Sequence, residues 1–290
     1  MVAAAAPAVP AEVRPEVRPE VRPTSSPAVP QLDLAELLAL NTTDWKLARL
    51  RGQPAVLVIQ FPQLLDQGLA LNRAAALIEK SGASRQRVLD DRALKDLVTR
   101  SGDNEKTFYQ GHGYVAEQLA RFYTLAAAQG VALNRQEQRL RQMLLDARGL
   151  SAHGVGYSAP GLQSVVSFTA TQADDPGTPQ DEGIDALRRE SVLRHELSHG
   201  LFFTDRRYRE HCWRFWRERL SDAERQRLRH MLGRLNYDTN NQTLMVNEAQ
   251  AFLMHTPDAR AFNAAALGVS ETQLADMRRR FLRDAPATVR

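Results

Sequence analysis

The stretch "SVLRHELSHGLFFTD" (191–205) most constrains the fold, because it holds two histidines four residues apart. On an α-helix, residues at this spacing differ by about 40° in direction and one turn in height. If the stretch is helical, His195 and His199 can therefore direct both imidazoles at one ion. Apart from Arg194, the residues flanking the pair are uncharged. We therefore expect a helix that is buried on both sides of the histidines.

Glu196 lies about 100° around this helix from His195, outside the imidazole pair but within reach of a water on the ion. A catalytic Zn²⁺ has three protein ligands and keeps one position open for water. The ion lowers the pKa of that water, and a nearby carboxylate accepts its proton as general base. The sequence thus predicts a Zn²⁺ cofactor, with His195 and His199 as ligands and Glu196 as catalytic base. Chance spacing is the competing interpretation.

The segment "VLRHELSHGL" (192–201) resembles the active-site helix of zincin metallopeptidases. This resemblance implies a zinc-dependent hydrolase that cleaves peptide bonds through a metal-activated water, with a peptide or protein as substrate. It is tight over these residues and loose over 192–256, and the N-terminal half resembles no family. Zincins lay an edge strand beside this helix to hold an extended substrate. We assign that strand to "LQSVVSFTATQ" (162–172), which alternates and is rich in β-branched residues.

The first candidate for the third metal ligand is Glu248 in "LMVNEAQAFLMH", on its own predicted helix. This resembles the gluzincin arrangement, in which the glutamate of an Asn-Glu pair on a later helix completes the site. A buried glutamate needs a compensating charge, which the metal supplies. Thermolysin-like enzymes have an aspartate four residues further on to brace a histidine, whereas this chain has Phe252. We assign the bracing role to Asn247 or Gln250 instead.

The second candidate for the third ligand is Asp205, six residues beyond His199. This spacing resembles the metzincin-type pattern, in which the helix ends abruptly at a glycine and the chain turns back. The position of that glycine is Phe202 here, which argues against the pattern. We therefore prefer Glu248 and keep Asp205 as the alternative. If Asp205 is not a ligand, we expect it to brace a histidine or to cap the next helix.

A hydrolytic site also needs a hydrogen-bond donor for the developing oxyanion. Tyr208 and Tyr237 are our predictions for this catalytic role. His211, His230 and His255 also follow the motif and are weaker candidates. For the two tyrosines, the competing interpretation is an ordinary half-buried aromatic.

The chain divides into three predicted parts. Residues 1–30 contain "EVRPEVRPEVRP", whose regular prolines exclude helix and sheet, so we expect an extended, disordered tail. Residues 31–150 predict a helical N-terminal lobe, and residues 151–290 a zincin-like catalytic lobe. The predicted fold class is α+β, predominantly helical, with a short edge strand beside the motif helix.

Within the N-terminal lobe, the pattern over 33–50 predicts a helix, and "AVLVIQF" (55–61) predicts a buried strand. We interpret "FYQGHGY" (108–114) as a glycine-marked loop or a helix entrance. Its His112, like His153 in "SAHGVGY", is interpreted as structural.

Composition limits the partners and the location. The net charge is +4, but acidic and basic residues are interleaved along the predicted helices, so we expect no nucleic-acid partner. No apolar run approaches the length of a membrane span. The start "MVAAAAPAVP" lacks the charged and apolar segments of an export signal, which predicts a cytoplasmic protein. A start further upstream would instead favour a periplasmic or secreted one. Nothing indicates the oligomeric state.

Two other functions compete with hydrolysis. One is a non-enzymatic, zinc-containing helical module, and the other is a basic binding protein in which the motif is fortuitous. Retention of Glu196 argues against the first, because a structural zinc site gains nothing from that carboxylate.

Overall fold

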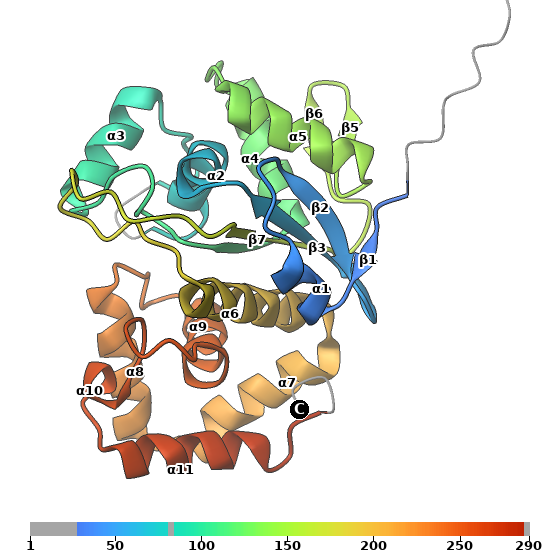
Figure 1. Ribbon diagram of the computed structural model, residues 1–290. Helices are drawn as coiled ribbons and strands as arrows, with labels where there is room; N and C mark the ends of the chain where they lie inside the picture. Colours follow the sequence, from blue (N-terminus) through green and yellow to red (C-terminus); the bar gives the residue numbers. More distant parts are fainter. Residues whose placement is uncertain (1–27, 81–83, 287–290) are drawn as a thin grey trace, which may run out of the picture.

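The computed structural model describes residues 28–80 and 84–286, so nearly all of the predicted tail at 1–30 lies outside the described residues. A five-stranded mixed sheet forms one layer of the molecule, and the long helix α6 (Ala186–Thr204) crosses one of its faces. On the far side of α6 lie most of the C-terminal helices (Figure 1). They are α7 (Arg206–Arg214), α8 (Asp222–Arg234), α9 (Gln242–His255), α10 (Ala264–Leu267) and α11 (Glu271–Leu282).

The strands follow the order β1-β2-β3-β7-β4 across the sheet. The strands β2 and β3 form an antiparallel hairpin that turns at Gly52, whose φ of 79° suits glycine. The strand β7 is parallel to β3 and antiparallel to β4, and all its residues are buried. The strand bounds are β1 (Gln31–Leu32), β2 (Lys46–Leu50), β3 (Gln53–Phe61), β4 (His112–Val115) and β7 (Ser164–Thr169).

The predicted edge strand at 162–172 is a strand, but its position in the sheet was wrong. The regular strand within it, β7, is paired with a neighbouring strand on both sides, so β7 has no free edge. The outermost strand next to it is β4, which the sequence pattern had indicated as a loop or helix entrance. Glycine is depleted in strands, and "GHGY" therefore gave little strand signal.

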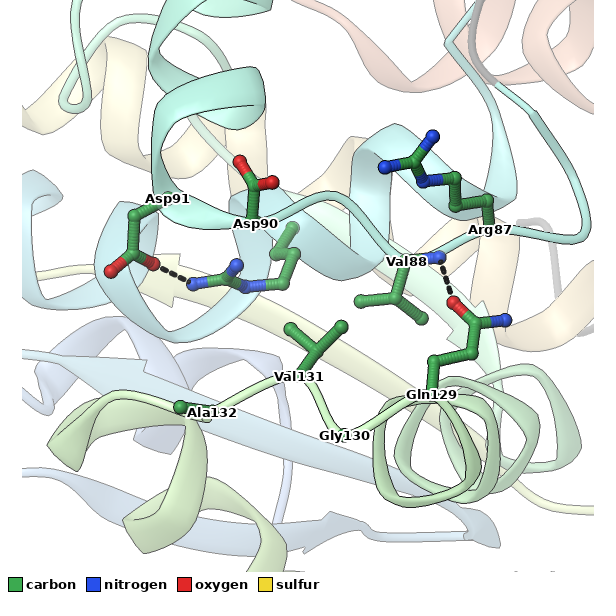
Figure 2. A pocket seen from close by; sticks show the side chains of 9 residues that line it. Arg87, Val88, Asp90, Asp91, Gln129, Gly130, Val131 and Ala132 are labelled. Carbon is green, nitrogen blue, oxygen red and sulfur yellow. Dashed lines mark hydrogen bonds and ion pairs between the residues drawn. The ribbon is translucent and has the colours of Figure 1, made fainter.

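The face of the sheet opposite α6 is covered by α2 (Leu64–Ile78), α4 (Ala116–Ala128) and α5 (Arg135–Asp146), with α3 (Asp91–Arg100) beside them. The buried Arg73 of α2 ties this layer together. Its guanidinium binds Glu137 of α5 at 2.7 Å and Asp91 of α3 at 2.5 Å. Figure 2 shows the cavity of about 620 Å³ beside this network, with Asp91 and Gln129 among its lining residues.

The class prediction of a helix-dominated α+β fold is confirmed, and the N-terminal half contributes strands as well as helices. Four of the five strands, β1 to β4, come from residues before 150. The predicted helix over 33–50 is only α1 (Leu34–Ala39), because the chain turns at Leu40 and then enters β2. The boundary predicted at residue 150 falls between strands of one sheet, since β7 pairs with β3 and β4.

The C-terminal helices have their own core, which contains Trp216, Met245 and Phe281. A π-helical turn (Phe215–Arg219) follows α7, and a small hairpin of β5 (Ser151–His153) and β6 (Gly156–Ser158) packs near α4. Among the described residues, no helix is both long enough and apolar enough to cross a bilayer.

Candidate metal centre

The helix α6 is fixed at both faces, as its uncharged flanks predict. Leu193 and Leu197 are buried against Val58 and Phe168 of the sheet, and α9 packs on the other side. At its start, Asp185 accepts a hydrogen bond from the Arg188 amide as N-cap. Because α6 is held this firmly, the side chains it projects toward α9 have a fixed position.

Three side chains meet between α6 and α9. The rings of His195 and His199 have their centroids 4.7 Å apart, and each Nε2 lies 3.5 Å from one carboxylate oxygen of Glu248. All three residues are buried as a group, and their ligand atoms lie within 4.8 Å of one another. The predicted ligands are thus together, and this group could hold a metal ion.

The orientation of His195 is set by a threonine. Its Nδ1 lies 2.9 Å from Thr256 Oγ1, and that hydroxyl donates at 3.0 Å to the Ala251 carbonyl. Thr256 therefore accepts the proton of Nδ1–H, which leaves the lone pair of Nε2 directed at Glu248 and His199. No pattern in the sequence indicates a role for this threonine. Of the two predicted bracing residues, Gln250 donates to Ser198 at 3.0 Å instead.

The second predicted bracing residue, Asn247, lies beside His199 and favours its charged form, but the Nδ1 of His199 has no hydrogen-bond partner among the described residues. Burial has the larger effect and lowers the pKa of His199 below its ordinary value. The imidazole is therefore neutral at physiological pH, the form that binds metals.

Glu248 has the electrostatic character of a ligand. Burial raises the pKa of its carboxyl, but the two imidazoles and the Tyr237 hydroxyl outweigh burial, and the pKa lies below its ordinary value. Its Oε2 atom is buried and has no hydrogen-bond donor among the described residues. A buried, ionised oxygen without a donor is stabilised by a cation, so the donor set fits a metal ion.

Glu196 lies beside this group and is only 7 % exposed. Burial, followed by the charges of Glu248 and Glu79, raises the pKa of its carboxyl well above the usual range. Its Oε2 also has no hydrogen-bond partner in the described part of the chain. A carboxyl with a raised pKa can accept a proton from a molecule bound next to it and can release that proton again.

Two glycines, Gly113 in β4 and Gly111 just before it, let this segment approach α6. A Cβ on Gly111 would lie 2.6 Å from Glu196 Oε1, and one on Gly113 would lie 2.7 Å from the Cβ of His199. The two glycines share one face of the strand because side chains alternate along it. His112 points to the other face, where its Nδ1 lies 3.2 Å from Ser167 Oγ. The glycines of "GHGY" are therefore a requirement of the site rather than a mark of a loop.

Two cavities flank the metal-binding group. The larger, of about 530 Å³, is lined by His195 and Glu196, and the smaller, of about 80 Å³, by Glu248. The strand β4 and the residues just before it border both, with Gly111 on the larger cavity and Gly113 on the smaller. The segment from Gly111 to Tyr114 therefore leads from the larger cavity to the smaller one.

The two predicted tyrosines have different surroundings. Tyr237 is half-buried and lines the larger cavity, and burial raises the pKa of its phenol so that the hydroxyl stays protonated. Tyr208 is fully buried in the helical core, where its hydroxyl contacts Gln250 and His255. Tyr208 does not line either cavity beside the metal-binding group.

The alternative ligand Asp205 is placed as a helix cap. Its carboxylate accepts hydrogen bonds from the backbone amides of Arg207 and Tyr208 at the start of α7, and it is not in the metal-binding group. His211 and His255 lie within the helical half, and His230 lines a separate cavity on α8. The structure therefore favours Glu248 as third ligand.

Three further residues at this site, Glu79, Lys80 and Tyr109, come from the N-terminal half and were missed. No motif connects them in the sequence, and only the folded chain brings them to the cavities. Comparison of the chain with models of protein families, with curated proteins and with solved structures found no match.

Proposed function

We propose that this protein is a zinc-dependent hydrolase that cleaves peptide bonds. The observation that supports it is the separation of 3.5 Å between each imidazole Nε2 and a Glu248 oxygen. Ligands about 2.0–2.1 Å from a tetrahedral zinc ion lie about 3.4 Å from one another. Two histidines and one carboxylate are a ligand set typical of catalytic zinc, with a fourth position left for water.

The catalytic roles follow from the surroundings of each residue. When bound, zinc lowers the pKa of a water molecule and polarises a substrate carbonyl. Glu196, whose free oxygen adjoins the ligands, accepts the proton and passes it to the leaving amine. Tyr237 keeps its proton and donates a hydrogen bond to the oxyanion.

The edge strand suggests how a substrate binds. The strand β4 is the outermost of the sheet and borders the smaller cavity, and the residues just before it border the larger one. An extended peptide can add to a free strand edge through main-chain hydrogen bonds, with its side chains in the flanking cavities. This arrangement would carry the scissile bond past Glu196 and the zinc ligands, and it transfers to β4 the role that the sequence had assigned to 162–172.

Metal analysis combined with one variant tests the proposal. We expect the purified chain to contain about one zinc per molecule. Glu196→Gln should keep that zinc and reduce hydrolysis of a peptide library by at least about 10²-fold, because only the general base is removed. Zinc without hydrolysis of any peptide or of casein would favour the non-enzymatic zinc module. Absence of zinc would favour the other alternative, a basic binding protein in which the motif is fortuitous.

A further inference from the structure

Lys80 occupies an unusual position in the wall of the larger cavity. It follows α2 closely, and its backbone forms an antiparallel bridge with Tyr237. The residue is only 6 % exposed, yet it lines the same cavity of about 530 Å³ as His195 and Glu196. A side chain this deeply buried beside the reacting groups is placed to contact a substrate rather than bulk water.

The ammonium group of Lys80 rests on aromatic rings and lacks an anionic contact. Its Nζ lies 4.4 Å from the ring centroid of Phe108 and 4.9 Å from that of Tyr109. Among residues 28–80 and 84–286, no hydrogen bond or ion pair within 4.0 Å involves this Nζ. Burial lowers the pKa of Lys80, and the charges of Asp103 and Glu79 only partly oppose this effect.

Arg73, the other deeply buried cation described above, shows what a structural role looks like. It is 2 % exposed, and its guanidinium is bound by Glu137, by Asp91 and by the Leu89 carbonyl. The cavity beside it (Figure 2) therefore faces a cation that is already neutralised. Lys80 has no such anions in contact, although burying an uncompensated charge is costly.

The aromatic platform under Lys80 is itself held in place. The carboxylate of Glu79 accepts a hydrogen bond of 2.7 Å from the Tyr114 hydroxyl and is also hydrogen-bonded by Tyr109. Phe108 and Tyr109 contact edge to face, with centroids 5.1 Å apart. The ammonium therefore has a defined location, which is what recognition of a ligand at one point requires.

We propose that Lys80 binds a carboxylate of the substrate, which makes this protein selective for peptides with a negative charge in the larger cavity. The inference rests on the proposed function for the position of the bond that is cleaved. A carboxylate would accept charge-assisted hydrogen bonds from the ammonium group and neutralise its charge, inside a site that excludes water. Arg234 also lines the cavity and adds positive charge to its wall, whereas Arg260 is already paired with Asp185 and Asp258. Asp103 and Glu196 are the acidic residues of the same lining.

The direction of β4 indicates which carboxylate is bound. The chain runs from Gly111, just before the strand and at the larger cavity, to Gly113 and Tyr114 of β4 at the smaller one. A peptide that pairs with it in the slightly more stable antiparallel sense runs the other way, so its C-terminal part occupies the larger cavity. Lys80 would then meet the C-terminal carboxylate. An Asp or Glu side chain of the peptide offers the same carboxylate, and the experiment below distinguishes it from the C-terminal carboxylate.

Peptide binding tests the proposal without hydrolysis. The full-length Glu196→Gln protein is titrated calorimetrically with Ala-Ala-Phe, with its C-terminal amide, and with Ala-Asp-Phe amide. We expect the free acid to bind about 10- to 100-fold more tightly than the amide, as for hydrogen bonds to charged groups. Tight binding of Ala-Asp-Phe amide instead would assign the site to an acidic side chain.

The variants identify the group responsible for the preference. Adding Lys80→Gln should abolish the difference between the carboxylate and amide peptides, and Lys80→Arg should restore part of it. Lys95→Gln, at an exposed lysine of α3, is the matched control and should change nothing. Circular dichroism of each variant checks the fold. Equal binding of all three peptides, no binding at millimolar concentration, or a preference that survives Lys80→Gln would overturn the proposal.

These experiments distinguish failure of the hydrolase proposal from failure of the role proposed for Lys80. Zinc and hydrolysis without carboxylate preference would remove only the role of Lys80. A preference that depends on Lys80, in a protein without zinc, would remove the hydrolase and leave a carboxylate-binding cavity.

Discussion

The two walls of the cavities are built in different ways. One wall is α6 and α9, where His195, His199 and Glu248 project from regular helices. The other wall is β4 with the end of α2, where glycines, aromatic rings and Lys80 face the same space. The helical wall holds ionisable groups that could bind a metal, whereas the sheet wall holds the groups that shape the cavity and carry its charge.

This difference shows which kinds of functional residue can be identified from a sequence alone. Helical periodicity places residues four apart on one face, so a metal-binding pair appears as a short motif. The sheet wall is assembled from separate segments, residues 79–80 and 108–114, which meet only after the sheet has formed. The following predictions test whether the two walls have these separate roles, in order of decreasing effect.

Removal of the third ligand should have the largest effect. Glu248→Ala is expected to weaken zinc binding by about 10²–10³-fold, because one of three protein ligands is lost. Competition with a chromogenic chelator measures this change. Asp205→Ala is the control and should keep its zinc, with a loss of about 1 kcal/mol in stability because it removes the cap of α7. Full zinc retention by the Glu248 variant would contradict the assignment.

Thr256→Val should have the next largest effect, still on the helical wall. The variant keeps the shape of the side chain but cannot accept the proton of His195 Nδ1. Loss of such a bracing hydrogen bond costs about 10- to 100-fold in metal affinity. The same chelator competition measures it, and Thr256→Ser should bind zinc like the original protein. Equal affinities for all three proteins would show that Thr256 does not orient the ring.

Gly113→Ala tests the sheet wall at its closest approach to the helix. The new methyl would lie 2.7 Å from the Cβ of His199 and 2.9 Å from Glu196 Oε2, so β4 and α6 must separate. We expect a loss of about 2 kcal/mol in the free energy of unfolding, measured in urea. Gly156→Ala is the control, because its nearest neighbour would be 3.4 Å away. A variant as stable as this control would show that the sheet wall adapts.

The smallest predicted effect is a dependence of stability on pH. Burial lowers the pKa of His112 to about 3, whereas an exposed histidine titrates at about 6.5. Its contribution is therefore complete above about pH 6.5 and is lost as the pH falls toward 3. At pH 5.5 the loss is about 1.4 kcal/mol. Urea unfolding of the metal-free protein at pH 7.5 and 5.5 should show this loss, and His112→Asn should reduce it. An unchanged dependence in the variant would contradict it.

Most of the helical wall could be predicted from the sequence. The spacing of His195 and His199 and the apolar flanks of the helix were sufficient, because both are properties of one continuous helix. Glu248 required a resemblance to be identified, since 49 residues separate it from His199 and no local pattern connects them. Thr256 could not be found, because its role depends on how the chain returns to α6 after α9.

The sheet wall was mostly missed for a physical reason. Strand prediction relies on β-branched and aromatic residues, and β4 contains glycine where it must approach α6. The short strand β2 was absorbed into a predicted helix, because "WKLARL" is compatible with either period. Lys80 carried no signal at all, since a single lysine after a helix is ordinarily a solvated residue.

The hydrogen bond between His195 and Thr256 also bears on how quickly the site can be loaded. Because a protein hydroxyl already fixes the tautomer and tilt of that ring, an arriving cation finds its nitrogen ligand in the binding orientation. Stripped protein should therefore recover its ion in a single fast step, without a slow rearrangement beforehand. Stopped-flow mixing with zinc would show one exponential whose rate rises in proportion to the concentration of the ion.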